Sequence, residues 1–178
     1  MFDITNSREI RIENDTAIKP FDCGDGDLND FLLNDAKKYQ ESLLAVSYLI
    51  ENDDDTIGYY SLINDKIERF EEEKSIWNRI NRKIPYRKQR KTYPAVKIGR
   101  LAVSDKYKGF SVGSFMVNRI THIYLAEKQL AGCRFITVDA YIKATGFYEK
   151  NGFRYLTDKD KNDDTRTMFL DLLSIKEV

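Results

Sequence analysis

The sequence feature that most constrains the fold is a glycine-punctuated turn, KYKGFSVGSF at 106–115, which joins segments of different periodicity. The segment before it, 95–103, is apolar and rich in β-branched residues, which is typical of a buried strand. A strand, a tight glycine turn and a helix can hold phosphate groups on backbone N–H groups. The spacing matches neither the Walker loop nor the GxGxxG fingerprint, so the turn alone also fits an ordinary connection. The helix is indicated by apolar residues at steps of four, four and three, namely Val112, Met116, Ile120 and Ile123.

The remaining pattern predicts a mixed α/β fold that is more antiparallel at its start than a doubly wound fold. A helix is expected after the turn at 21–27, capped by Asp25 or Asp27. ENDDD at 51–55 reads as a hairpin connection. With 178 residues the chain suffices for one well-packed domain, which we expect over 1–178. Further strands are expected at 8–14, 44–51, 56–63, 133–140 and 165–173, and further helices at 71–83 and 143–153.

Composition excludes several classes of protein. Lys plus Arg equals Asp plus Glu at 29 each, so the total charge identifies no partner. The N-terminus lacks the basic and apolar regions of a signal peptide, and the longest apolar run, 42–50, is about half of a membrane span. Cys23, Cys133 and His122 form neither a disulfide framework nor a metal-ligand cluster. We therefore expect a cytoplasmic protein without metal or membrane association.

Two motifs carry a family resemblance. GRLAVSDKYKGFSVGSFMV at 99–117 resembles the acetyl-CoA signature of the GNAT N-acetyltransferases, and ATGFYEKNGF at 144–153 resembles their later motif. The family pattern Arg/Gln-x-x-Gly-x-Gly/Ala falls on residues 108–113, where Lys108 replaces Arg or Gln and Ser111 replaces the first patterned glycine. The resemblance implies a GNAT fold: a mixed central sheet, antiparallel in its N-terminal part, with a splayed parallel pair at the acetyl-CoA site and flanking helices.

The resemblance also implies which residues act. The strand end would bind pantetheine like an added strand, and the loop amides would hold the pyrophosphate. Tyr148, in the FYxxxGF motif, would protonate the departing CoA thiolate; the alternative is a core aromatic residue. The residues expected to bind acetyl-CoA are Leu101, Ala102, Val103, Lys108, Gly109, Phe110, Ser111, Val112, Gly113 and Ser114.

The acceptor is suggested by a missing carboxylate. YPAVKIGRLAV at 93–103 holds no acid where many relatives place a general base, although Asp139 or a water could serve instead. An α-amine with a pKa near 8 is about a quarter neutral at pH 7.5, whereas lysine is only about 0.1% neutral. An α-amine or an aminoacyl ester therefore fits better than a lysine side chain.

The N-terminal half extends the resemblance. The segments at 21–36, 57–62 and 93–105 resemble the GNAT branch of toxin–antitoxin toxins that acetylate aminoacyl-tRNA, which commonly pair with a small DNA-binding antitoxin. Between Lys74 and Lys108 twelve basic residues stand against one acid, which suggests an anionic partner, although a net charge of zero is low for an RNA-binding protein. The expected tRNA-facing residues are Arg87, Lys88, Arg90 and Lys91.

Two alternatives stay open beside the tRNA reading. The first is a GNAT enzyme that acetylates a small amine, a peptide or a protein, with the basic residues lining its cleft. The second is a non-catalytic acetyl-CoA-binding module, which the departures at Lys108 and Ser111 favour. A homodimer is also left open.

Overall fold

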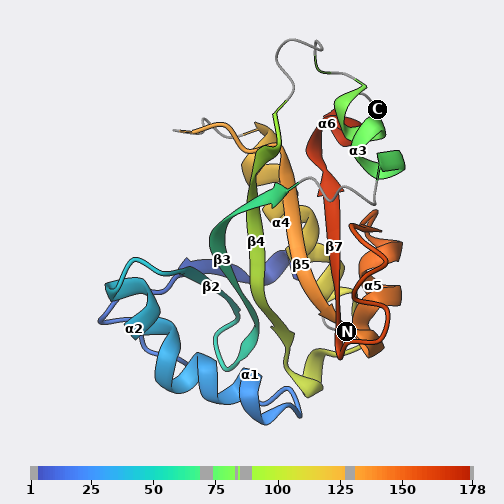
Figure 1. Cartoon of the computed structure of the whole chain (residues 1–178). Coiled ribbons are helices and arrows are strands. Elements are labelled where there is room, and N and C mark those ends of the chain that lie inside the picture. Colours follow the sequence, from blue (N-terminus) through green and yellow to red (C-terminus); the bar gives the residue numbers. More distant parts are fainter. Residues whose placement is uncertain (1–3, 69–73, 83, 85–89, 127–130, 177–178) are drawn as a thin grey trace. The chain divides into compact units, whose positions relative to one another are not determined.

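The computed structural model describes residues 4–68, 74–82, 84, 90–126 and 131–176 (Figure 1). Its strands form a seven-stranded sheet in the order β1-β2-β3-β4-β5-β7-β6. The β4–β5 pair is parallel, whereas β1–β2, β2–β3, β5–β7 and β6–β7 are antiparallel. The predicted mixed sheet with an antiparallel N-terminal part is confirmed. By its contacts the chain divides into two compact units, Met1–Ile63 with Ile98–Ile123 and Asn64–Lys97 with Tyr124–Val178.

The first unit combines antiparallel strands with a helical segment. The N-cap of its first helix is Asp25, whose carboxylate accepts a hydrogen bond from the Leu28 N–H at 3.3 Å, as predicted for one of the two candidate aspartates. Its core includes Leu32, Leu49 and Tyr59, all fully buried. Its elements are β1 (Arg8–Arg11), α1 (Gly26–Asp30), the π-helical turn η2 (Phe31–Asp35), α2 (Ala36–Glu41), β2 (Val46–Glu51), β3 (Thr56–Glu68, whose first part lies here), the end of β4 (Thr92–Val103) and most of α4 (Val112–Ala126).

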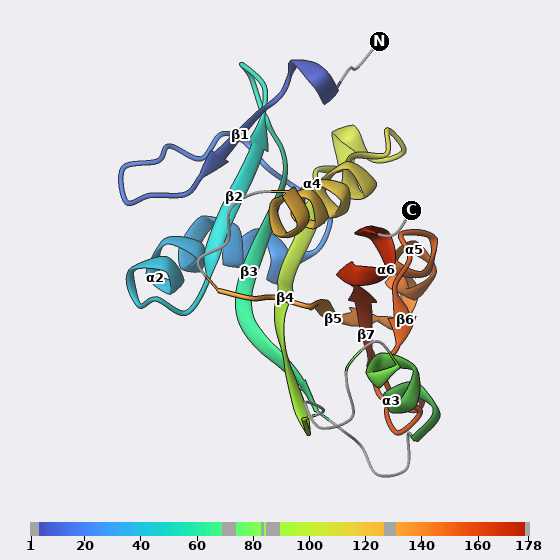
Figure 2. The ribbon, with the colours of Figure 1, turned by 90° about the horizontal axis from the view of Figure 1, so that it is seen from above.

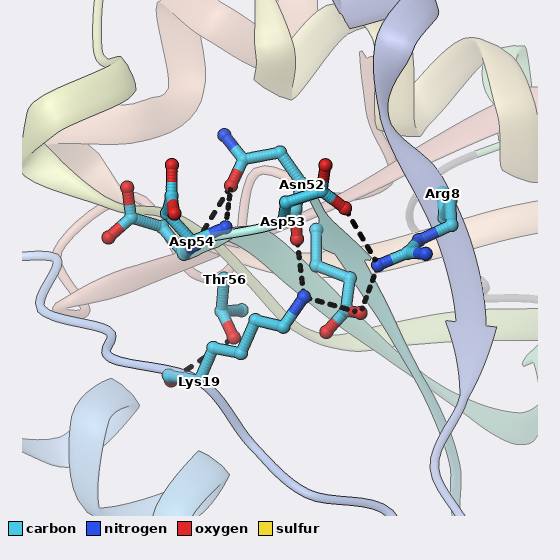
Figure 3. Close-up of polar contacts among 8 residues, drawn as sticks. Arg8, Lys19, Asn52, Asp53, Asp54 and Thr56 are labelled. Carbon is cyan, nitrogen blue, oxygen red and sulfur yellow. Dashed lines mark hydrogen bonds and ion pairs between the residues drawn. The ribbon is translucent and has the colours of Figure 1, made fainter.

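The β2–β3 hairpin connection is fixed by side chains (Figure 3). The Asn52 side-chain oxygen accepts hydrogen bonds from the N–H groups of Asp54 at 3.0 Å and Asp55 at 2.8 Å. Lys19 pairs with the buried carboxylate of Glu51 at 3.1 Å. The predicted ENDDD hairpin is confirmed, and its polar residues close the turn locally.

The second unit has an aromatic core. The rings of Trp77 and Tyr93 stack at 5.4 Å, and Phe135 packs edge-on against Phe169 at 6.0 Å. In both views α5 and α6 lie beside β7 (Figures 1 and 2). The elements are α3 (Lys74–Asn81), β4 (Thr92–Val103, whose first part lies here), β5 (Phe135–Tyr141), α5 (Thr145–Lys150), β6 (Arg154–Tyr155), β7 (Thr165–Asp171) and α6 (Leu172–Lys176).

Two short elements, β6 and α6, were not anticipated, because two and five residues give too little periodicity to recognise. β4 begins at Thr92, earlier than the expected start at Ala95. No helix in the described ranges is long and apolar enough to cross a bilayer. Nor do the described residues bring three or more potential metal ligands together.

Candidate active site

The glycine-punctuated turn leads from β4 into α4 within the first unit. A single 3₁₀ turn, η4 (Asp105–Tyr107), follows the strand, and α4 begins at Val112. Two residues of the turn have left-handed backbones, Gly109 with φ +84° and Ser111 with φ +59°. Glycine takes such a conformation freely, but an L-residue with a side chain does so at a cost. Ser111, which departs from the family pattern, therefore adopts the backbone geometry for which glycine is suited.

The start of α4 presents backbone N–H groups. The first intrahelical hydrogen bond runs from the Phe115 N–H to the Ser111 carbonyl at 3.0 Å. The N–H groups of Val112, Gly113 and Ser114 precede that bond, so they have no carbonyl acceptor within the helix. Gly109 and Ser111 are exposed beside them. This arrangement can hold a phosphate or pyrophosphate group on backbone amides.

The turn is anchored to the β2–β3 hairpin through a buried tyrosine. The Tyr107 hydroxyl donates to Asp55 Oδ2 at 2.6 Å and accepts from the Asn52 side-chain amide at 3.0 Å. Hydrogen bonds from Lys106 and Tyr107 hold the pKa of the Asp55 carboxyl below its ordinary value. The turn is thus positioned by residues about fifty positions earlier in the chain. Sequence reading missed Asp55 and Tyr107 in this role, because no local pattern connects residues so far apart.

Lys108 does not point freely at a ligand. Its ammonium group donates to the Cys23 carbonyl at 2.9 Å and is paired with Asp105. The hydrogen bond to Asp105 is the main reason that the pKa of Lys108 lies above its ordinary value. Lys108 therefore keeps its charge, but contact with a phosphate would require it to leave Asp105.

The end of β4 carries the residues expected to bind pantetheine. Ala102 is buried in the core of the first unit, whereas Leu101 and Val103 are half-buried. A Cβ placed on Gly58 would lie 2.8 Å from the Ala102 carbonyl oxygen, so the close approach of β3 requires glycine there. The parallel register of β4 with β5 covers only Ala95–Lys97 against Phe135–Thr137, and β4 continues to Val103. The parallel β4–β5 pair is as predicted, and the splay of its far end stays a prediction.

Tyr148 lies on α5 in the second unit. Its ring is buried and meets Phe147 at 4.9 Å and Phe153 at 5.3 Å, both edge-on. Its hydroxyl has no hydrogen-bond partner among the described residues, where Arg100 Nε is the only fully buried side-chain N or O atom lacking one. Burial of the ring raises the pKa of Tyr148, so the group is protonated at neutral pH and can donate.

Helix α5 ends as its sequence predicts. Gly152 has φ +87°, and the Phe153 N–H donates back to the Tyr148 carbonyl at 3.0 Å. This left-handed end brings Phe153 against Tyr148. Tyr148 is therefore packed in an aromatic cluster, and its hydroxyl makes no hydrogen bond with the described residues.

Asp139, the alternative general base, is engaged in the structure. Lys97 donates to Asp139 Oδ2 at 2.8 Å, and the Thr167 hydroxyl donates to Asp139 Oδ1 at 3.1 Å. Both oxygens of this carboxylate therefore already accept a hydrogen bond. Asp139 would have to leave Lys97 before accepting a proton from an amine.

The basic stretch divides into paired and unpaired residues. Its second half is paired with acids: Lys97 with Asp139 at 2.8 Å, Arg100 with Asp27 at 3.6 Å, Lys106 with Asp55 and Lys108 with Asp105. Arg87 and Lys88 lie outside the described residues. The exposed residues of the stretch that have no ion pair in the described ranges are Lys74, Arg82, Arg90 and Lys91.

The family follows from comparison with known proteins. The acetyltransferase (GNAT) domain family matches residues 44–155, which include the glycine turn and Tyr148. The chain belongs to the GNAT acetyltransferase family. It is accordingly an acyltransferase that uses acetyl-CoA, as the two motifs predicted. A search of curated proteins found no match.

Solved structures share the fold over nearly the whole chain. A tyrosine-to-phenylalanine mutant of KacT is 25% identical, covers 97% of this chain and 98% of its own, and has a TM-score of 0.77. AtaT complexed with acetyl-methionyl-tRNAfMet is 24% identical over 96% of this chain and 98% of its own, with a TM-score of 0.76. AtaTR bound with AcCoA is 24% identical over 97% and 98%, with a TM-score of 0.75.

Proposed function

We propose that this acetyltransferase transfers the acetyl group to the α-amine of aminoacyl-tRNA and so acts as a toxin that blocks translation. The observation that carries the proposal is the near-complete structural match to AtaT, which is complexed with acetyl-methionyl-tRNAfMet. That match extends through the N-terminal half, beyond the part covered by the family match. The absence of an acid from 93–103 favours an acceptor that is already partly neutral.

The backbone of Leu101, Ala102 and Val103 binds pantetheine in this proposal, and an amide there polarises the thioester carbonyl. The amine attacks this carbonyl, and collapse of the tetrahedral intermediate releases the CoA thiolate. Tyr148 donates its hydroxyl proton to the sulfur, for which its protonated hydroxyl is suited. The proton lost by the attacking nitrogen passes to water, and Tyr148 is reprotonated from water, so that the products are the amide and the CoA thiol. The pyrophosphate is held by the turn residues Lys108, Gly109, Phe110, Ser111, Val112, Gly113 and Ser114.

The proposal also covers the location of the protein, its protein partner and its tRNA-binding surface. We place the protein in the cytoplasm, as a single functional domain paired with a small DNA-binding antitoxin. Two neighbours support the pairing: an AtaT mutant toxin bound to the C-terminus of the antitoxin AtaR, and a KacTA–DNA complex. The tRNA surface is assigned to the basic segment ahead of β4, with Arg87, Lys88, Arg90 and Lys91.

The decisive experiment offers the purified chain labelled acetyl-CoA with charged tRNA, uncharged tRNA and a panel of small amines and peptides in separate reactions. We expect label only on charged tRNA, and release of that label together with the amino acid when the ester bond is hydrolysed. Label on uncharged tRNA would point to a base or ribose acceptor and contradict the proposal. Hydrolysis of acetyl-CoA with every acceptor left unlabelled would contradict it as well.

A small amine or peptide is the second candidate acceptor. It is favoured by the pairing of Lys97, Arg100, Lys106 and Lys108 with acids, which lowers the positive charge available to RNA. Label on a member of the amine panel, with charged tRNA unlabelled, would select this candidate. Any acetyl transfer at all would eliminate the non-catalytic acetyl-CoA-binding module.

A further inference from the structure

A cavity of about 180 Å³ in the second unit is lined by arginines from three separate segments. Arg82 follows α3, Arg134 precedes β5, and Arg154 lies on β6. A cavity of this size has room for several waters, or for an anion of moderate size. Neither the cofactor turn nor Tyr148 contributes to its lining.

One arginine of the cavity is already neutralised. Arg134 donates to Asp171 through Nε at 2.7 Å and through Nη2 at 2.9 Å, which is a bidentate pair. Asp171 Oδ1 also accepts the Leu173 N–H at 3.1 Å. Both partners are therefore held in place, and they form a fixed wall of the cavity with no net charge.

The other two arginines are not paired with any acid in the described part of the chain. Arg82 and Arg154 are exposed, and neither forms an ion pair with any described residue. Three arginines against one aspartate leave a net charge of +2 on the lining. Two further lining residues, Ile80 and Phe169, are buried apolar side chains. Apolar lining residues lower the local dielectric constant, which strengthens the attraction between the guanidinium groups and an anion.

We propose that this cavity binds a phosphate group, with Arg82 and Arg154 as its ligands and the Arg134–Asp171 pair as a fixed wall. Guanidinium groups match the oxygens of a phosphate in planar, paired hydrogen bonds. A charge of +2 suits the one or two negative charges of a phosphate better than a neutral polar ligand. That the phosphate belongs to the backbone of the tRNA acceptor rests on the proposed function, whereas a free phosphate satisfies the same chemistry.

The test compares wild type with the double variant Arg82→Gln/Arg154→Gln. A matched control, Lys66→Gln/Lys161→Gln, removes two exposed charges of the same unit that lie outside the cavity. Inorganic phosphate binding is measured by calorimetry with the cofactor turn already saturated with CoA, so that this turn does not contribute. Affinity for tRNA is measured in parallel over a series of salt concentrations.

We expect the double variant to lose phosphate binding and to bind tRNA about tenfold more weakly or worse, as for lost charge-assisted hydrogen bonds. Its log–log salt slope should be flatter by on the order of 1.4 to 1.8, for two phosphate contacts. Loss of phosphate binding with unchanged tRNA affinity would also support the site and identify its ligand as a free phosphate. Equal behaviour of the double variant and the control in both measurements would overturn the proposal.

Two control measurements, of thermal unfolding and of acetyl transfer, separate loss of the site from loss of the fold and from failure of the proposed function. Thermal unfolding of each variant establishes that the fold is retained, and the single variant Arg154→Gln replaces the double variant if it is not. Acetyl transfer to charged tRNA is scored separately. If wild type fails to acetylate tRNA but binds phosphate through Arg82 and Arg154, the proposed function fails while this site stands.

Discussion

Replacing Ser111 with glycine should stabilise the protein. Its φ of +59° costs an L-residue about 1–2 kcal/mol relative to a right-handed backbone. Its hydroxyl makes no hydrogen bond in the described part of the chain, so no helix cap is lost on substitution. Glycine adds about 0.5–1 kcal/mol of unfolded-chain entropy that folding must overcome. The difference is a net stabilisation of up to about 1.5 kcal/mol, and each kcal/mol raises the Tm by about 2–4 °C in a chain of this length.

The assay is thermal and urea unfolding of wild type and three variants. Ser111→Ala keeps the left-handed strain and should unfold close to wild type. Ser114→Gly, a matched serine in the first turn of α4, should destabilise by about 0.5–1 kcal/mol because its backbone is helical. If Ser111→Gly destabilises the protein as much as Ser114→Gly does, the serine is not strained and the reasoning is refuted. Acetyl-CoA affinity should not fall in Ser111→Gly, since the proposed ligands there are backbone amides.

Four further outcomes test the site. Tyr148→Phe should keep acetyl-CoA affinity but slow turnover by roughly 10²-fold or more, and wild-type turnover would return Tyr148 to a packing role. Gly113→Glu should weaken acetyl-CoA binding in calorimetry, because it adds bulk and a like charge where the pyrophosphate meets the helix; unchanged affinity in a folded variant would contradict the turn assignment. The hydrogen bonds that lower the pKa of Asp55 stabilise the folded protein at pH values above the ordinary pKa of 3.8. This stabilisation is lost as the pH falls through the lowered pKa of the folded state. Asp55→Asn should therefore lower the free energy of unfolding at neutral pH, and the variant should lose less stability than wild type when the pH falls. If the acid unfolding profile is the same as that of wild type, the contact of Asp55 with Tyr107 does not stabilise the protein in this way. The last outcome concerns the proposed tRNA surface, made of Arg87, Lys88, Arg90 and Lys91. Neutralising these four residues should weaken tRNA binding but not acetyl-CoA binding, and should flatten the log–log dependence of tRNA affinity on salt by on the order of 0.7–0.9 per lost phosphate contact. Parallel salt slopes with equal tRNA affinities would exclude this surface.

Most of the fold could be predicted because its elements are long enough to show their period. Three of the four residues predicted to form the buried stripe of α4, Val112, Met116 and Ile120, are fully buried, whereas Ile123 is half-buried. β3 is longer than predicted, since its last five residues, 64–68, are mostly polar and have low strand propensity. Strand residues gain stability from pairing and packing with neighbours, which overrides weak intrinsic preference. Local sequence therefore placed the strands better than it placed their ends.

The contacts that position the cofactor turn could not be predicted in the same way. Tyr107 and Asp55 are brought together only when β3 and β4 have formed, so neither residue shows its role in its own neighbourhood. Ser111 is different, because its departure from a glycine pattern was visible in the sequence. What the structure adds is its positive φ, which converts that departure into a measurable strain.

The basic stretch shows why charge counted along a chain differs from charge available to a ligand. A count along the sequence treats Lys97, Arg100, Lys106 and Lys108 as free charges. In the structure each forms an ion pair with an aspartate, and three of these aspartates lie outside the basic stretch of the sequence. Within this stretch, the exposed cations that have no ion pair among the described residues fall between Lys74 and Lys91, ahead of most of β4. We therefore expect a polyanion to be attracted to that segment, where Arg82 also borders the arginine-lined cavity. At the turn, where Lys108 is already paired, a pyrophosphate would instead depend mainly on the backbone N–H groups at the start of α4.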